Sequence, residues 1–209
     1  MFGSIAAQFN AGGDFMWIIL AVFALAVAVM IERLIYFFIY CNNDTMKTAS
    51  NLIAKLKSGN IKDAEQIASS RTTPMHKLMN VAVSSYSGGK EPEIIIERIE
   101  QAAIRELPRL SNRINYLSLI ANVSTLLGLL GTITGLQLSF SALADDASQQ
   151  AAMLAVGISK AMNTTAFGLI VAVPCMVMYT FLSNKQQKLV KTIDEAVSHI
   201  VSAIKEKKA

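Results

Sequence analysis

The sequence predicts an all-α integral membrane protein with three transmembrane helices, two of which extend into a cytoplasmic helical domain. Two observations predict this fold class. Of the 209 residues, 53% are hydrophobic and only 16% are charged, whereas about 25% are charged in a typical soluble domain. The charges are also unevenly distributed, because three long stretches are almost free of them. A stretch of about 20 apolar residues is long enough to cross a bilayer.

The first stretch predicts a transmembrane helix over residues 15–41, preceded by an external segment over residues 1–14. The charges within this helix are the adjacent pair Glu32 and Arg33, near its inner end. A cleaved signal peptide is the alternative interpretation, but it requires a basic region at its start. Residues 1–14 contain no Lys or Arg, so a retained helix is favoured.

The second and third transmembrane helices are expected over residues 114–144 and 158–184. The second stretch contains no charge and the third contains only Lys160, near its beginning. Both are long enough to cross the bilayer. Pro174 lies inside the third stretch, where it removes one backbone hydrogen bond, so we expect a bend there.

The distribution of basic residues predicts the orientation in the membrane. Lys and Arg are frequent over residues 42–113 and again over residues 185–209, whereas residues 145–157 contain two aspartates and no basic residue. Cytoplasmic segments are enriched in Lys and Arg. The sequence therefore predicts an external N-terminus, a cytoplasmic helical domain over 42–113, an external loop over 145–157 and a cytoplasmic C-terminal helix over 185–209.

Capping and turn residues divide the cytoplasmic domain into helices, because Asn and Asp cap helix starts and Gly commonly follows helix ends. No alternation typical of strands competes with this pattern. The expected boundaries are Asp44 and Gly59 for the first helix, Asn60 and Ser70 for the second, and Pro74 and Gly88-Gly89 for the third.

A fourth helix is expected to begin at Pro92, a residue well suited to a helix start. Its apolar residues keep helical spacing into the second transmembrane stretch, which predicts one helix of about 50 residues, on the order of 75 Å long. Pro108 is expected to kink it. The C-terminal segment repeats the pattern with an apolar stripe that continues from the third span and is formed by Leu189, Ile193, Val197, Ile200 and Ile204.

Small residues recur at steps of three and four along the second span. A face of this kind lets a neighbouring helix backbone approach closely. Small residues could also merely tolerate lipid, but the opposite positions are bulky leucines and isoleucines, which favours a helix-packing face. In the second span the face contains Ala121, Ser124, Gly128, Gly131, Gly135, Ser139 and Ala142, and in the third Gly157, Ala161, Thr165, Gly168 and Ala172.

Hydroxyl side chains also recur at every seventh residue of the second span, at Ser118, Thr125, Thr132 and Ser139. A single hydroxyl in a membrane helix usually bonds to the carbonyl one turn earlier. A line of four could instead face water, an ion or a polar partner helix. Asn163 and Thr164 add polar groups to the third span.

The spans contain no carboxylate at depth. The chain alone therefore offers no group that binds and releases a proton within the bilayer. If ions are moved, a partner must supply that group.

Other classes of function find little support in the sequence. The net charge of +4 comes with no nucleic-acid-binding motif, so no nucleic acid is expected as a partner. The two cysteines are far apart and lack metal-ligand spacing, so neither a disulfide framework nor a metal site is expected. Catalytic motifs are missing, and His76 and His199 are isolated. We therefore expect no catalytic residue, no cofactor and no enzyme activity.

Two segments carry a specific resemblance to a known family. Residues 121–135 (ANVSTLLGLLGTITG) resemble the second-span signature of ExbB and TolQ proteins, and residues 161–174 (AMNTTAFGLIVAVP) resemble their third-span signature. The Glu32–Arg33 pair and the order of the three spans are also similar to this family. MotA proteins share the broader plan but usually add a fourth span.

The resemblance implies a homopentamer in the bacterial inner membrane that surrounds two copies of a one-span, ExbD/TolR-like partner whose aspartate carries the proton. A TonB- or TolA-like protein is a further possible partner. Thr132 and Thr165 match the threonines that the family associates with that aspartate. With Thr125 and Thr164 they form the expected lining of the ion pathway, and Lys160, Glu32 and Arg33 are expected at charged interfaces.

Two positions depart from the family pattern. Thr125 replaces a common proline, so the second span is expected to be straighter, and Lys160 replaces a common glutamate. This inverted charge leaves open the identity of the driven machine and of the ion, proton or sodium.

The leading hypothesis is a subunit of a proton-driven motor that serves envelope transport, envelope integrity or motility. A freestanding channel or transporter is one alternative, although it would normally carry its own ionisable residue at the membrane midplane. A membrane scaffold that conducts nothing is the other.

Overall fold

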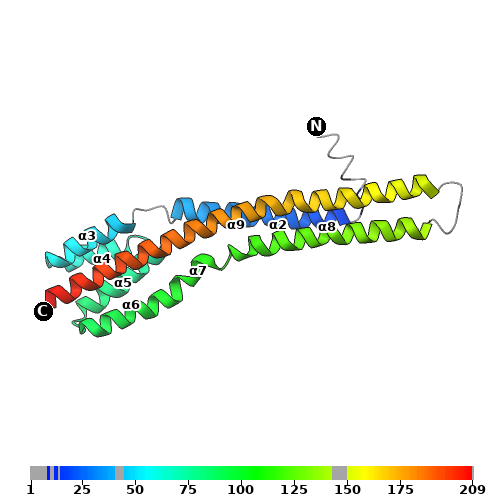
Figure 1. Ribbon diagram of the computed structural model, residues 1–209. Helices are drawn as coiled ribbons and strands as arrows, with labels where there is room; N and C mark the ends of the chain where they lie inside the picture. Colours follow the sequence, from blue (N-terminus) through cyan, green and yellow to red (C-terminus); the bar gives the residue numbers. More distant parts are fainter. Residues whose placement is uncertain (1–8, 10–11, 14, 41–44, 143–149, 209) are drawn as a thin grey trace. The chain divides into compact units, whose positions relative to one another are not determined.

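The computed structural model describes the chain except residues 1–8, 10–11, 14, 41–44, 143–149 and 209 (Figure 1). The described residues form helices joined by short turns and contain no strand. This confirms the predicted all-α fold class. The helices are α2 (Phe15–Ile35), a π-helical turn η1 (Tyr36–Tyr40), α3 (Thr45–Lys57), α4 (Ile61–Ser69), α5 (Pro74–Ser87), α6 (Pro92–Glu106), α7 (Pro108–Ser111), α8 (Asn115–Ala142) and α9 (Gln150–Lys208).

The chain divides into two compact units. The first unit contains Met1–Arg33 and Ile114–Phe181, and the second contains Leu34–Arg113 and Leu182–Ala209. Helix α9 contributes to both. We call them the membrane unit and, after the location that the sequence predicts for it, the cytoplasmic unit, and describe each separately.

In the membrane unit, α2, α8 and the first part of α9 lie side by side (Figure 1). Their shared core consists of small and medium-sized apolar side chains. Its buried members are Ile19, Ala26, Ile120, Ala121, Val171, Ala172 and Cys175. Within the described part of the chain, three helical stretches are long and apolar enough to cross a membrane, namely Phe15–Phe38, Pro92–Ser141 and Ala152–Glu206.

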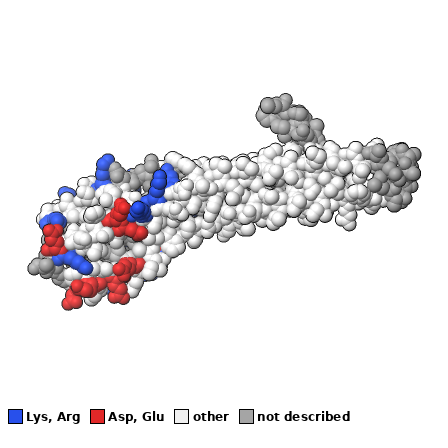
Figure 2. Space-filling view, viewed as in Figure 1, with Lys and Arg blue, Asp and Glu red and all other residues white. Residues whose placement is uncertain are grey.

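The outer surface of the membrane unit is apolar. Large side chains such as Trp17, Leu126 and Val156 are 66, 63 and 69% exposed, a pattern that would be costly in water over so large an area. On the face drawn in Figure 2, no charged side chain interrupts the surface formed by α2, α8 and the first part of α9. Such a surface matches a hydrocarbon environment.

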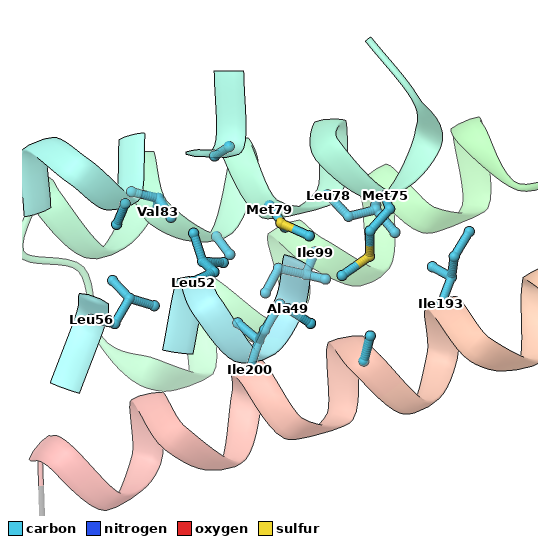
Figure 3. Close-up of a cluster of buried hydrophobic side chains, with 14 of the residues drawn as sticks. Ala49, Leu52, Leu56, Met75, Leu78, Met79, Val83, Ile99, Ile193 and Ile200 are labelled. Atoms are coloured by element: carbon cyan, nitrogen blue, oxygen red, sulfur yellow. The ribbon is translucent and has the colours of Figure 1, made fainter. Parts of the chain in front are cut away.

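The cytoplasmic unit has a conventional hydrophobic core to which α3, α4, α5, α6, α7 and the last part of α9 all contribute (Figure 3). Its largest side chains include Leu52, Leu78, Met79, Ile99 and Ile193, all of which are almost completely buried. The apolar stripe predicted on the C-terminal helix supplies Ile193, Ile200 and Ile204 to this core.

Ion pairs join elements at the surface of the cytoplasmic unit. Lys55 pairs with Asp63 and Lys57 with Glu206, each at 2.7 Å between nitrogen and oxygen. Glu106 accepts from Lys77 at 2.7 Å and from Arg109 at 3.0 Å.

The predicted helix boundaries in this unit agree with the structure where they can be compared. Asn60 caps α4 by accepting from the Asp63 N–H, and Thr73 caps α5 immediately before Pro74. Gly59 and Gly89 have φ of +79° and +69°, a conformation that few residues other than glycine adopt readily. The predicted cap at Asp44 lies outside the described residues.

The single helix expected from Pro92 into the second span is in fact three helices. Helix α6 ends at Glu106, α7 covers Pro108–Ser111, and α8 begins at Asn115. Proline has no N–H to donate and its ring crowds the preceding turn, which explains the interruption between α6 and α7 at Pro108. The predicted kink at Pro108 is present, and the predicted helical run from Pro92 to Ser141 is found but is interrupted at Leu107 and again at residues 112–114.

Helix α9 begins earlier than the third span was expected to begin. Residues 150–157, which the sequence places in the external loop, are helical. This segment contains Ala, Met and Leu, which favour helix strongly. Helix α9 also continues without interruption through Pro174, whose side chain is exposed.

Candidate functional site

Helices α8 and α9 approach each other closely along the glycines of their small-residue faces. A Cβ atom added to Gly168 would lie 2.7 Å from the Ser124 carbonyl oxygen, and one added to Gly128 would lie 3.2 Å from the Thr165 Cα. Both neighbours are backbone atoms, which cannot rotate away. The backbones are therefore close enough that only glycine fits without displacement.

The same contact continues toward the end of α8 and the start of α9. Gly131 faces the side chain of Thr164, and Gly135 faces Ala161, which a Cβ would approach to 3.3 Å. Further along, Ser139 of α8 occupies the space in front of Gly157 of α9. Most of the small residues predicted to pack helices thus lie between α8 and α9 of one chain, namely Ser124, Gly128, Gly131, Gly135, Ser139, Gly157, Ala161, Thr165 and Gly168.

Two threonines of α9 direct their hydroxyls toward one carbonyl of α8. The Thr165 Oγ1 donates to the Gly128 oxygen at 3.2 Å. The Thr164 Oγ1 donates to the Ala161 oxygen at 2.7 Å and lies 3.5 Å from the same Gly128 oxygen. Thr164 is completely enclosed, whereas Thr165 is half-buried. Thr165 therefore bridges the helix pair and still reaches its surface.

The threonines of α8 bond within their own helix. Thr125 donates to the Ala121 oxygen at 3.0 Å and Thr132 to the Leu129 oxygen at 2.6 Å. Thr125 is exposed and Thr132 is half-buried. Each hydroxyl oxygen keeps lone pairs that can accept from a further donor. Both residues border a surface that neither α2 nor α9 covers.

The line of hydroxyls at every seventh residue does not stay on one face. A straight α-helix drifts by about 20° per heptad. Ser139, three heptads after Ser118, has therefore turned onto the face packed against α9, where it is buried and donates to the Gly135 oxygen at 2.8 Å. The exposed part of the line ends near Thr132.

Asn122 extends this exposed polar line, although the sequence analysis did not select it. It lies one turn after Ser118 and three residues before Thr125, and its side chain is exposed. Asn122 could have been identified from the sequence because its amide lies inside an uncharged apolar run. Polar groups are costly there unless they have a polar neighbour. The exposed line thus contains Asn122 and Thr125, which are exposed, and Ser118 and Thr132, which are half-buried.

The charged residues selected from the sequence lie at opposite ends of the membrane unit. Arg33 is buried near the end of α2, and its Nη2 donates to the Glu32 carboxylate at 2.9 Å. Lys160 is half-buried on α9, and its side chain lies against Gly13, just before α2.

Among the described residues of the membrane unit, Glu32 is the one acidic side chain. Nor do the described residues contain a cluster of His, Cys, Asp and Glu suited to a metal ion. The α8–α9 surface can therefore offer hydroxyl and amide groups to a charge, but it carries no group of its own that exchanges a proton there.

Three apolar helices with closely packed small residues and one exposed polar line define a multi-pass helical membrane protein. Residues 70–195 match the model of the MotA/TolQ/ExbB proton channel family. This segment includes both signatures and most of the elements that form the α8–α9 surface. The chain belongs to this family.

Individual relatives show the same similarity. The chain is 38% identical over 96 residues to the Tol-Pal system protein TolQ of Haemophilus influenzae, a match that covers 44% of this chain and 42% of the relative. It is 26% identical over 185 residues to a putative biopolymer transport protein ExbB homolog of Methanothermobacter thermautotrophicus, covering 88% of this chain and 64% of that protein. The chain thus spans less than two thirds of the length of these relatives.

Proposed function

We propose that this chain is the ring-forming subunit of a proton-driven motor in the bacterial inner membrane. In this proposal it assembles as a homopentamer around the membrane helices of an ExbD/TolR-like partner dimer and converts proton-motive force into work on envelope transport, envelope integrity or motility. Family membership and the similarity to proteins named TolQ and ExbB support the class.

The exposed polar line on α8 is the observation that carries the proposal. An apolar helix surface that is meant only for lipid gains nothing from an amide and three hydroxyls. A polar line next to a helix pair that lacks acids suits a partner that brings its own carboxylate. An ionised carboxylate in such a ring would be costly, by several kcal/mol, unless donors or water met it.

Thr132 and Thr165 are the donors that we assign to that carboxylate. Each hydroxyl would rotate and exchange its present bond, to the Leu129 or Gly128 oxygen, for one to the carboxylate. Thr132 lies at the border of the exposed line, and the Thr165 hydroxyl reaches the surface of the helix pair beside Gly128. As the partner turns within the ring, its carboxylate would be charged beside these hydroxyls and protonated beside leucine or valine. Proton release would thereby be coupled to motion.

Valine substitutions test this assignment. Thr132→Val and Thr165→Val keep the side-chain shape and remove the hydroxyl, and we expect each to reduce proton flux on the order of tenfold or more, because a hydrogen bond to a charged group contributes about 1.5–3 kcal/mol. Flux is measured in proteoliposomes that contain this chain and an ExbD/TolR-like one-span partner. Serine at either position should retain part of the flux.

Thr134→Val is the matched control. Thr134 is also a half-buried threonine of α8 and bonds within its own helix, to the Leu130 oxygen at 3.0 Å. The complex with Thr134→Val should conduct protons at the wild-type rate. If Thr132→Val and Thr165→Val form the complex and conduct as well as Thr134→Val, the hydroxyls serve packing only and the assigned pathway is wrong. Flux without the partner would instead indicate a freestanding channel.

The proposed orientation places the N-terminus outside and the C-terminus in the cytoplasm, on the basis of the basic residues. In a variant without Cys41 and Cys175, single cysteines at Gly12 or Ser148 should react with an impermeant maleimide in intact spheroplasts. Cysteines at Ser58 or Lys205 should react only after permeabilisation. Reaction of the Ser58 cysteine in intact spheroplasts would contradict this orientation.

A further inference from the structure

Lys185 and Phe38 form a cation–π pair, in which the Lys185 Nζ lies 3.4 Å from the centre of the Phe38 ring. Both residues belong to the cytoplasmic unit, Phe38 in the π-helical turn η1 and Lys185 on α9. Phe38 is 45% exposed and Lys185 is half-buried. The ring covers one side of the ammonium, whose three N–H donors cannot all point toward it. The pair can therefore still donate to a ligand.

The charge pattern of the sequence places this pair at the edge of the hydrocarbon. Residues 161–184 carry no charge, and Lys185 follows them directly. A helix of this length rises about 36 Å, whereas the hydrocarbon core of a bilayer is about 30 Å thick. The first apolar stretch, Phe15–Phe38, ends at Phe38. The cation–π contact joins the ends of two separate apolar stretches, so both residues lie at the level of the lipid headgroups.

The turn η1 holds the Phe38 ring in place. The neighbouring Phe37 is completely buried, and its ring meets Tyr36 edge to face at 5.6 Å. Tyr36 packs against the core of the cytoplasmic unit. Single π-helical turns are rare and often occur at functional sites. Phe38 is thus fixed at the surface next to a residue anchored in the interior.

Lys188 adds a second positive charge one turn after Lys185, and it is exposed. Like charges at this spacing on a helix repel each other weakly. Among the residues that the structure describes, neither ammonium is paired with a carboxylate. An anion bound to both lysines would remove this repulsion.

Two ammonium groups beside an exposed aromatic ring complement a phosphate that is attached to apolar chains. A basic residue near the surface of an anionic membrane contributes about 1 kcal/mol to the attraction. Aromatic rings also favour the headgroup level, where one side is apolar and the other is wet. A zwitterionic headgroup gains less, because its own cation offsets the charge of its phosphate.

We propose that Lys185, Lys188 and Phe38 form a headgroup site for an anionic phospholipid. The phosphate accepts hydrogen bonds from the two ammonium groups, and an acyl chain lies against the Phe38 ring. The bound lipid holds η1 at the membrane surface. The inference rests on the proposed function only in assigning the site to the cytoplasmic leaflet.

Native mass spectrometry tests the preference for an anionic headgroup. The full chain in detergent is mixed with equal amounts of phosphatidylglycerol and phosphatidylcholine that carry the same acyl chains, and the ratio of the first bound lipid of each kind is measured. The wild-type chain should favour phosphatidylglycerol. Lys185→Gln should lower the ratio about fivefold, the equivalent of about 1 kcal/mol for one lysine. Phe38→Leu keeps an apolar side chain but removes the ring, so it should lower the ratio by a smaller factor.

Lys205→Gln is the matched control, because it removes another lysine from α9, an exposed one near the C-terminus. It should leave the ratio unchanged. Glycerol phosphate at millimolar concentration supplies the phosphate without acyl chains and should not displace the bound phosphatidylglycerol.

Three results would overturn the proposal. The wild-type chain shows no preference for phosphatidylglycerol, or Lys185→Gln and Lys205→Gln give equal ratios, or glycerol phosphate displaces the lipid and so assigns the lysines to a soluble phosphate.

Hydrogen exchange in nanodiscs tests where the lipid binds. Replacing phosphatidylcholine by phosphatidylglycerol should slow exchange of the Tyr36–Tyr40 amides about fivefold in the wild-type chain and leave it unchanged in Lys185→Gln, because the bound lipid holds η1. Equal slowing in both chains would contradict the assigned position.

These measurements are independent of the motor proposal, because they record neither proton flux nor orientation. A failure here leaves that proposal standing, and a failure of the valine test leaves the lipid site standing. Labelling of the Ser58 cysteine in intact spheroplasts would move the site to the other leaflet and leave its chemistry unchanged.

Discussion

The two units of this chain are stabilised in opposite ways. The cytoplasmic unit buries large side chains such as Leu52, Met79 and Ile99 and adds ion pairs at its surface. The membrane unit buries mainly small groups and brings α8 and α9 into near backbone contact at Gly128 and Gly168. Many of its large apolar side chains, among them Leu126, point outward, although Met16, Ile114 and Leu117 are buried.

The difference follows from the solvent. In water, burial of apolar area contributes roughly 25 cal/mol per Å², so a large buried side chain stabilises the fold most. In a bilayer the surrounding lipid is as apolar as leucine, and helices associate through close packing and hydrogen bonds. Loss of side-chain volume should therefore destabilise the cytoplasmic unit, whereas gain of volume should destabilise the membrane unit.

The largest expected effect is on the cytoplasmic core. Ile99→Ala should lower the free energy of unfolding of this unit by about 2–5 kcal/mol, because it removes a buried side chain and leaves a cavity. Ile99 is 2% exposed, whereas Ile104 on the same helix is 74% exposed. Hydrogen exchange of the α5 and α6 amides measures the change. Ile104→Ala is the control, and equal effects of both substitutions would contradict the core described for this unit.

The next largest expected effect is a loss of stability in the membrane unit. It arises from added side-chain volume, whereas the effect of Ile99→Ala arises from lost volume. Gly168→Ala adds one methyl group against the Ser124 carbonyl and should destabilise the α8–α9 pair by about 1–3 kcal/mol, a typical cost of overpacking. Thermal unfolding in detergent measures it.

Ala166→Val provides the comparison for Gly168→Ala. It adds more volume to the same helix, but Ala166 is exposed, so the apolar surface should accommodate it with little change. If Ala166→Val is as damaging as Gly168→Ala, the close contact at Gly168 does not determine the stability of this unit.

The smallest expected effect is a dependence of stability on pH. It distinguishes the two units because the titrating residue, His76, lies in the cytoplasmic unit. Burial, with a smaller contribution from Arg71, lowers the pKa of His76 from its ordinary value of 6.5. The unfolded chain therefore binds a proton more readily than the folded one. Stability of the cytoplasmic unit should be constant above about pH 6.5 and should fall as pH decreases from there toward the lowered pKa.

Hydrogen exchange of the α5 amides across this pH range measures the effect, and His76→Gln should reduce the dependence. The exposed His199 provides the control through His199→Gln. Exchange in α8 should not follow the His76 titration. An unchanged pH dependence in His76→Gln would show that other groups cause it.

Much of the fold was accessible from the sequence, because local patterns determine it. Uncharged stretches predicted the three apolar helices, and Asn60, Pro74 and Pro92 indicated helix starts that the structure contains. The early start of α9 at Gln150 was missed, because helical propensity and loop polarity gave conflicting signals there. The break between α6 and α8 was only partly anticipated, since a proline predicts a kink more reliably than an interruption.

Less of the candidate site could be predicted from the sequence. A heptad line of hydroxyls suggested one surface, but the drift of the helix turned Ser139 into the contact with α9 and left Asn122 on the exposed side. Thr164 and Thr165 are neighbours in the sequence, yet only Thr165 reaches the surface. Which side of a helix is covered depends on where its neighbours lie.

The sequence by itself determined the family, the helical class, the three apolar helices and the absence of an acid from the apolar stretches, since each follows from residue identity and local order. The tertiary structure alone decided that Lys160 rests against Gly13 and that Lys185 lies over the Phe38 ring. The physical reason is that helix rotation and close approach depend on shape across segments far apart in the chain. A one-dimensional pattern does not specify that shape.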